Sequence, residues 1–256
     1  MRTVDATRYV TPLREGGSLP GLVEASDEGL YVAKFRGAGQ GARALVAEVI
    51  AGELGRALGL RIPELVLMRI DPQLASAEPD EEIQDLLAAS EGLNLGVDFL
   101  PGALPFSPAV GPVPDPAEAA DIVWFDALIT NVDRTARNTN LLTWHRQLWL
   151  IDHGASLYFH HAPERVPGEE RNAFPAIAEH VLLPYAGSIH GADERLAPRI
   201  TPALIDRVLE AVPLEWLDRP AKPDDGGMQL YRTFLTGRCQ APRRFVFEAE
   251  RARAAG

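Results

Sequence analysis

The first hundred residues of the chain contain short runs of apolar and β-branched residues, separated by glycine-rich or charged turn sequences. Runs of this length and composition are typical of β-strands, and Asp27-Glu28-Gly29 between two of them favours a hairpin turn. We therefore predict five strands, over residues 7–14, 21–26, 29–36, 64–70 and 93–100.

A wider spacing of apolar residues marks a helix in the same part of the chain. Gly59 is suited to end a helix over residues 42–58. The apolar stripe of this helix consists of Leu45, Val49, Leu54 and Leu58. Residues 71–92 are rich in acidic side chains, and we predict a short helix there with a solvated face.

Residues 101–116 contain six prolines, and the pattern beyond them is mostly helical. Helices are predicted over residues 117–130, 173–183, 202–212, 228–236 and 243–253, and a β-hairpin over residues 141–144 and 148–151. We therefore predict an α+β chain with a small β-rich lobe, residues 1–100, joined to a larger helical lobe, residues 101–256. The arginines near the end of the chain are predicted to form a solvated helix face: Arg238, Arg243, Arg244, Arg251 and Arg253.

The composition is that of an ordinary globular protein, with 46% hydrophobic and 24% charged residues. The 36 acidic and 25 basic residues give a formal net charge of −11, which argues against direct nucleic-acid binding and against attraction to anionic membranes. The single cysteine, Cys239, excludes an internal disulfide. Residues 1–10 lack the features of a targeting signal, and no apolar run approaches the roughly 20 residues of a membrane span. We therefore expect a cytoplasmic location.

The first candidate catalytic and metal-binding residues lie in and after the loop predicted to follow the helix over residues 117–130. Asp133 is followed five positions later by Asn138, and Asp152 comes at the end of a second apolar run. A carboxylate such as Asp133 can accept the proton of an attacking hydroxyl group, while the oxygens of Asn138 and Asp152 are hard ligands suited to Mg²⁺. The pattern indicates phosphoryl transfer.

The positive charge that such a reaction needs is predicted on an upstream strand. Lys34 lies within the strand over residues 29–36, and the only other lysine of the chain is Lys222. We expect Lys34 to contact the α- and β-phosphates of ATP, with Glu48 of the following helix orienting it and Glu53 as the alternative. The lysine is predicted on a strand, the glutamate on a helix, Asp133 and Asn138 in a loop, and Asp152 at the end of a strand. This combination, in the order Lys, Glu, Asp, Asn, Asp, favours a kinase more than any single residue does.

Two glycine-rich segments are candidate phosphate contacts. Gly16, Gly17 and Ser18 lie between the first two predicted strands, where a flexible loop can cover phosphates through its backbone N–H groups. Residues 37–41 precede a helix N-terminus, which also favours anions. The chain lacks the Gly-x-x-x-x-Gly-Lys-Ser/Thr motif, which argues against a P-loop enzyme.

Several histidines lie near Asp152 in the sequence, but their spacing does not match a zinc site. His153, His160 and His161 fit neither the His-Glu-x-x-His pattern nor a cysteine-based site. We predict packing or polar-surface roles for them.

The combination of these motifs resembles the HipA-like kinases, a bacterial branch of the protein-kinase-like fold. The resemblance is carried by Tyr31-Val32-Ala33-Lys34-Phe35, by the Ala47-Glu48 helix with Leu58-Gly59-Leu60 and Pro63 after it, and by residues 133–138 with Asp152. The last of these motifs is also similar to that of phosphoinositide kinases. The resemblance covers about residues 7 to 160.

The resemblance implies a two-lobed kinase fold and an ATP- and Mg²⁺-dependent enzyme that phosphorylates serine or threonine of a protein. It implies Asp133 as the catalytic base, Asn138 and Asp152 as metal ligands, and Lys34 as the ATP lysine. The strand ending in Val97-Asp98-Phe99-Leu100 is then the hinge, with Asp98 and Leu100 as candidate adenine contacts. In HipA-like toxins a serine of the phosphate loop can be autophosphorylated, and Ser18 is the matching candidate.

Some positions depart from the family pattern and leave alternatives open. Thr135 stands where these relatives often have His, Arg137 where Lys is common, and His153 where Phe or another apolar residue is found. The alternatives are a small-molecule or lipid-headgroup kinase on the same scaffold, and a nucleotide-binding pseudokinase that scaffolds a partner. Adenylyl transfer in place of phosphoryl transfer is also compatible with these residues.

Overall fold

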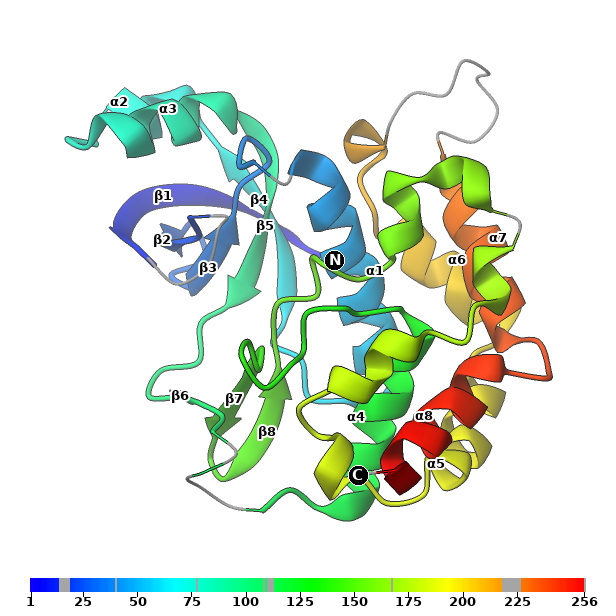
Figure 1. Ribbon diagram of the computed structural model, residues 1–256. Helices are drawn as coiled ribbons and strands as arrows, with labels where there is room; N and C mark the ends of the chain where they lie inside the picture. Colours follow the sequence, from blue (N-terminus) through cyan, green and yellow to red (C-terminus); the bar gives the residue numbers. More distant parts are fainter. Residues whose placement is uncertain are drawn as a thin grey trace. The chain divides into compact units, whose positions relative to one another are not determined.

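The chain folds into a mixed α+β structure, shown as a computed structural model in Figure 1. The structure describes residues 1–13, 19–39, 41–76, 78–107, 109, 113–166, 168–217 and 227–255. Two compact units are present. The first consists of Met1–Val46 and Pro63–Pro101, and the second of Ala47–Ile62 and Gly102–Gly256.

The five strands of the first unit close into a barrel in the order β1-β2-β3-β5-β4. Neighbouring strands are antiparallel except for β1 and β4, which pair in parallel and close the barrel. The strands span Thr3–Pro12 (β1), Gly21–Ala25 (β2), Leu30–Lys34 (β3), Leu65–Ile70 (β4) and Gly92–Asp98 (β5). All five were predicted; β1 begins at Thr3 rather than at residue 7.

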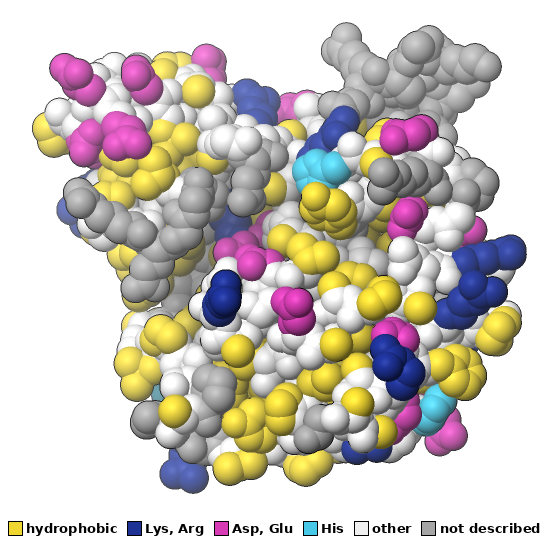
Figure 2. Space-filling model, viewed as in Figure 1, with side chains coloured by type: hydrophobic (Ala, Val, Ile, Leu, Met, Phe, Trp, Pro, Cys, Tyr) yellow, Lys and Arg dark blue, Asp and Glu magenta, His cyan; other side chains and the backbone are white. Residues whose placement is uncertain are grey.

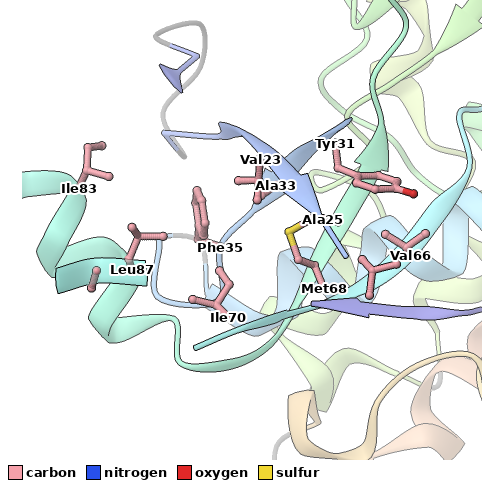
Figure 3. Close-up of a cluster of buried hydrophobic side chains, with 12 residues drawn as sticks. Val23, Ala25, Tyr31, Ala33, Phe35, Val66, Met68, Ile70, Ile83 and Leu87 are labelled. Carbon is pink, nitrogen blue, oxygen red and sulfur yellow. The ribbon is translucent and has the colours of Figure 1, made fainter. Parts of the chain in front are cut away.

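Apolar side chains fill the barrel, as Figure 3 shows for residues such as Val23, Ala33 and Met68. Gly96 of β5 allows the close approach of a neighbouring strand, because a Cβ atom there would lie 2.7 Å from Val66 Cγ2. The core extends to α2 (Pro72–Ser76) and α3 (Glu81–Ala89), which contribute Ala75, Ile83 and Leu87. Hydrophobic burial therefore fixes the positions of these strands and helices.

The outer face of α3 is acidic, as predicted for residues 71–92. Glu81, Glu82 and Asp85 are exposed, and acidic side chains gather over this part of the molecule in Figure 2. Asp80 caps the helix by accepting a hydrogen bond from the Glu82 N–H group.

The central helix of the second unit is α4 (Pro116–Leu128), and nine of its residues are buried. Asp115 accepts hydrogen bonds from the N–H groups of Ala117 and Glu118, and Pro116 occupies the first turn, where its missing N–H group costs no hydrogen bond. The second unit also contains most of α1 (Gly41–Leu58), which begins in the first unit. Both helices match the predictions for residues 42–58 and 117–130.

A small sheet of three strands follows the order β6-β7-β8. The predicted hairpin is confirmed by β7 (Leu141–Trp144) and β8 (Gln147–Leu150), and β6 (Leu104–Pro105) adds a short edge. His145 and Arg146 both have positive φ, as the tight turn between β7 and β8 requires.

The helix predicted over residues 173–183 is wrong. Two short 3₁₀ helices occupy this region, η4 (Pro175–Glu179) and η5 (Leu183–Tyr185), and His180 between them has an extended backbone. The side chain of His180 bonds to Asp126, a contact between distant parts of the chain that local sequence does not reveal. Further 3₁₀ helices precede them, at Tyr158–His161 (η1), Pro163–Arg165 (η2) and Glu169–Arg171 (η3).

Four more α-helices follow in the second unit. The predictions for residues 202–212, 228–236 and 243–253 are confirmed by α6 (Pro202–Glu210), α7 (Met228–Cys239) and α8 (Arg244–Ala255). The short helix α5 (Ile189–Leu196) was not predicted. Short 3₁₀ turns flank α6, at Ala197–Arg199 (η6) and Leu214–Trp216 (η7). None of the helices in the described part of the chain has the length and apolar character needed to cross a membrane.

Candidate functional site

The loop that carries Asp133 begins where α4 ends. Thr130 takes a left-handed conformation with φ of 54°, which turns the chain out of the helix. The Asn131 N–H group then donates to the Asp126 carbonyl, 2.9 Å away, and ties the start of the loop to the last turns of α4. The helix therefore fixes the point from which the loop departs.

Two asparagine amides hold the carboxylate of Asp133 from one side. Asn138 Nδ2 donates to Asp133 Oδ2 over 2.8 Å, and Asn140 Nδ2 donates to the same oxygen over 3.2 Å. The backbone N–H group of Asp133 donates to Asn131 Oδ1 over 3.1 Å. Within the described part of the chain nothing donates to Asp133 Oδ1, so this oxygen is the one available to a bound hydroxyl group.

Beneath the loop lies a buried polar network of Asp126, Arg134 and His180. Arg134 Nε and His180 Nε2 lie 2.6 and 2.9 Å from Asp126 Oδ2, and Asn131 Nδ2 lies 3.0 Å from Asp126 Oδ1. Burial by itself raises the pKa of Asp126, but the Arg134 guanidinium and the His180 hydrogen bond hold it well below its usual range. Burial lowers the pKa of His180 in spite of the nearby carboxylate. The network thus holds an ion pair and a neutral imidazole.

The same arginine connects the loop to the end of β8. Arg134 Nη1 donates to the carbonyls of Asn140 and Ile151, the latter at 3.3 Å, and the Ile151 N–H group donates to the Asn140 carbonyl over 3.1 Å. Asp152 follows at once, exposed and with φ of 56°. Aspartate tolerates this left-handed conformation better than most residues. Asp133 and Asn138 thus contact each other directly. Hydrogen bonds join Ile151, the residue before Asp152, to the same loop.

Glu48 and His153 meet in the interior of the second unit. Glu48 of α1 is 3% exposed and His153 is 1% exposed, and Glu48 Oε2 lies 3.9 Å from His153 Nδ1. The His153 ring also lies edge-on to Phe125, with 6.3 Å between ring centroids. His153 has the packing role predicted for it.

Lys34 belongs to the first unit, where the strand register fixes its face. Tyr31 and Ala33 point into the barrel, so Lys34 shares the outer face of β3 with Leu30 and Val32. Lys34 pairs with Leu95 of the neighbouring strand β5. The neighbours of Lys34 on this face of the sheet, Leu30, Val32 and Leu95, are thus apolar.

The predicted hinge follows the end of β5. The N–H groups of Asp98 and Phe99 donate to the carbonyls of Glu64 and Leu30 over 2.8 and 3.0 Å. The N–H group of Leu100 donates to no residue among those described. Gly16, Gly17 and Ser18, the predicted phosphate loop, lie outside the described residues.

Four buried or half-buried residues of the site did not emerge from the sequence as candidates: Asp126, Arg134, Asn140 and His180. Arg134 and Asn140 lie inside the motif region, and a second asparagine close to Asp133 was a signal that could have been used. Asp126 is one of three acidic residues in a mostly apolar helix, and the sequence does not distinguish it from Glu118 and Asp121. Nothing in the local sequence marks His180.

The prediction of a solvated arginine face is wrong for Arg238, which is 2% exposed. Its guanidinium donates to the carbonyls of Leu128 and Ala127, the last residues of α4, with 3.1 Å between Nε and the Leu128 oxygen. It also lies over the Phe245 ring, 4.4 Å from the centroid. Burial lowers the pKa of Arg238 to about 9. A cation at the C-terminal end of α4 satisfies carbonyls there and stabilises the helix directly before the loop that carries Asp133.

Comparisons with known proteins identify a family and a similar fold. The chain matches a family model described as HipA-like kinase over residues 7–236. Among solved structures, its fold is similar to that of the Helicobacter pylori proinflammatory kinase CtkA, with a TM-score of 0.59 and 13% sequence identity. The match covers 99% of this chain and 98% of that chain. No curated protein matches the chain in sequence.

Proposed function

Because the chain belongs to the HipA-like kinase family, we propose that it transfers the γ-phosphoryl group of ATP, with Mg²⁺, to the hydroxyl group of a serine or threonine in a protein. The first unit is then the nucleotide-binding lobe and the second the catalytic lobe of a two-lobed kinase, close to the division predicted between residues 100 and 101. The family supports the phosphotransferase activity, and the site residues support the roles below.

The observation that carries the proposal is the environment of Asp133. Both amides that contact its carboxylate donate to Oδ2, which leaves Oδ1 to accept a hydrogen bond from the attacking hydroxyl group. As the acceptor oxygen bonds to the γ-phosphorus, the bond from that phosphorus to the β,γ-bridging oxygen breaks and ADP leaves. The hydroxyl proton passes to Asp133. Such a reaction depends mainly on positioning, which the two asparagines provide.

Asn138 and Asp152 fit the role of Mg²⁺ ligands by their chemistry. Asn138 uses its amide nitrogen for Asp133, so its amide oxygen remains for a cation. Asp152 is an exposed carboxylate whose preceding residue is anchored to the catalytic loop. An amide oxygen and a carboxylate are hard ligands of the kind that Mg²⁺ prefers. When bound, the ion would neutralise charge on the phosphate oxygens.

The remaining roles concern the nucleotide. We assign Lys34 to the α- and β-phosphates, Glu48 to orienting that lysine, and the Leu100 N–H group with Asp98 to the adenine. The Leu100 N–H group is a suitable donor, since no described residue accepts from it. Gly16, Gly17 and Ser18 complete the proposal as the loop that covers the phosphates.

The test is ATP turnover by the full chain with Asp133→Asn, which keeps the size of the side chain. Turnover should fall about 10²- to 10⁴-fold, the usual range for a general base. Asp121→Asn is the control, because Asp121 lies on α4 in an ion pair with Arg195, 2.6 Å away, and should leave turnover unchanged. Equal turnover in wild type and Asp133→Asn would show that this residue is not the catalytic base.

The acceptor and the transferred group need a separate experiment. Incubation with a lysate and ATP should add about 80 Da to a protein, the mass of a phosphoryl group, whereas adenylyl transfer would add about 329 Da. Label only on small molecules or lipids would identify the alternative kinases. Binding of ATP without any turnover would identify the pseudokinase.

A further inference from the structure

His180 reaches the catalytic loop from a distant part of the chain. Its side chain is 5% exposed and contacts Asp126, 54 residues earlier. The backbone of the same segment also joins the loop: His180 forms an antiparallel bridge with Thr135, and the Val181 N–H group donates to the Arg134 carbonyl over 3.1 Å. The segment is therefore attached to the loop by both its backbone and its side chain.

The hydrogen bonds of the His180 ring fix its tautomer. The Leu182 N–H group donates to Nδ1 over 3.0 Å, so Nδ1 is an acceptor. In the neutral ring the proton then lies on Nε2, which donates to Asp126 Oδ2. That oxygen also accepts from Arg134 Nε, while Asp126 Oδ1 accepts from Asn131.

In this arrangement a single carboxylate, that of Asp126, binds side chains on both sides of the candidate base in the sequence. Asn131 precedes Asp133 by two positions and Arg134 follows it by one, and Asp126 binds both side chains. His180 is the third donor to Asp126, and it does not contact Asp133 itself. The side chain of His180 therefore acts on the loop through Asp126.

We propose that His180 is a positioning residue of the phosphoryl transfer: by its bond to Asp126 it fixes the orientation of the loop that carries Asp133. The inference rests on the proposed function. Loss of one donor lets the Asp126 carboxylate rotate, and with it the two side chains that flank Asp133. A displacement of about 1 Å at a reacting group can cost on the order of 10²-fold in rate.

Two substitutions separate the two hydrogen bonds of the ring. In His180→Gln the amide nitrogen can occupy the place of Nε2 and keep the bond to Asp126. In His180→Asn the shorter side chain can accept from the Leu182 N–H group but does not reach Asp126. We expect kcat to fall on the order of 10²-fold in His180→Asn and to recover about tenfold in His180→Gln, with KM for ATP unchanged in both.

The matched control is His160→Gln. His160 is also buried, at 2% exposure, but its ring bonds to the Tyr231 hydroxyl group, 3.2 Å away. This variant should lose stability and keep kcat. All activities are measured below the unfolding midpoint of the least stable variant.

Each outcome decides between positioning and mere structural support. Equal kcat in the two His180 variants, a fall of kcat in His160→Gln similar to that in His180→Asn, or a His180→Asn chain that does not fold would overturn the inference. In these cases an active wild type leaves the proposed function standing. A wild type without phosphoryl transfer overturns both.

Discussion

The two compact units hold their candidate site residues by different physical means. In the first unit Lys34 is placed by the register of β3 in a barrel whose interior is apolar. In the second unit Asp133 is placed by amide donors and by a buried ion pair between Asp126 and Arg134. The first arrangement depends on volume and shape, and the second on every polar partner being present.

This difference predicts unequal tolerance to substitution. Apolar interiors accept side chains of similar volume at a modest cost. A buried ion pair does not accept the loss of one partner, because the remaining charge is left without compensation in a medium of low polarity. The loop that carries Asp133 should therefore be less tolerant of substitution than the barrel.

The chain offers a simple way to observe one unit. All four tryptophans lie in the second unit, at positions 124, 144, 149 and 216. Tryptophan fluorescence therefore reports the unfolding of the second unit, while far-UV circular dichroism reports both.

The largest effect on stability is expected for Asp126→Ala. The substitution leaves the Arg134 guanidinium buried without its carboxylate and should lower the free energy of unfolding by about 3–5 kcal/mol. Urea unfolding followed by tryptophan fluorescence measures this change. Asp121→Ala is the control; it removes a partly exposed pair with Arg195 and should cost no more than about 1 kcal/mol. Similar losses in the two variants would contradict the special fragility of the network.

An intermediate effect is expected in the barrel. Met68 is fully buried there, so Met68→Ala should cost about 2–5 kcal/mol, whereas Met68→Leu keeps the volume and should cost less than about 1.5 kcal/mol. Because Met68 lies in the first unit, circular dichroism should show a larger shift than tryptophan fluorescence. If Met68→Leu proves as costly as Met68→Ala, the barrel depends on exact shape more than on volume.

The two units also differ in how far the sequence predicts them. The strands of the barrel follow from local runs of apolar residues, and Lys34 became a candidate because strand and lysine are both visible in one short segment. Asp133 and Asn138 became candidates because of their spacing, and the structure places them in hydrogen-bond contact. The barrel register and the inward face of Tyr31 and Ala33 depend on pairings that local sequence does not contain.

The residues that escaped prediction are those whose partners are far away in the chain. Arg238 looks like its neighbours Arg251 and Arg253, yet it binds carbonyls more than a hundred positions earlier, while those two pair with Glu248 and Glu250 three positions away. His180 likewise interrupts a predicted helix because of a contact with Asp126. Polar tertiary contacts override local preference in both cases.

The smallest expected effect is a change in the free energy of unfolding with pH, and it again tests the role of His180. Its pKa is lowered in the folded protein, whereas an unfolded histidine titrates near 6.5. Above that pH both states are neutral and stability is complete; as the pH falls below it, the unfolded state binds a proton that the folded state does not, and stability is lost. Between pH 7.5 and 5.5 the wild type should lose up to about 1.4 kcal/mol more than His180→Gln, measured by urea unfolding at each pH. The other five histidines are common to both proteins and cancel in this difference, and the titration of Asp126 lies at lower pH because its pKa is also lowered. An equal pH dependence in the two proteins would mean that the folded protein binds a proton at His180 Nδ1 in this pH range, which would contradict a ring that stays neutral there and accepts from the Leu182 N–H group.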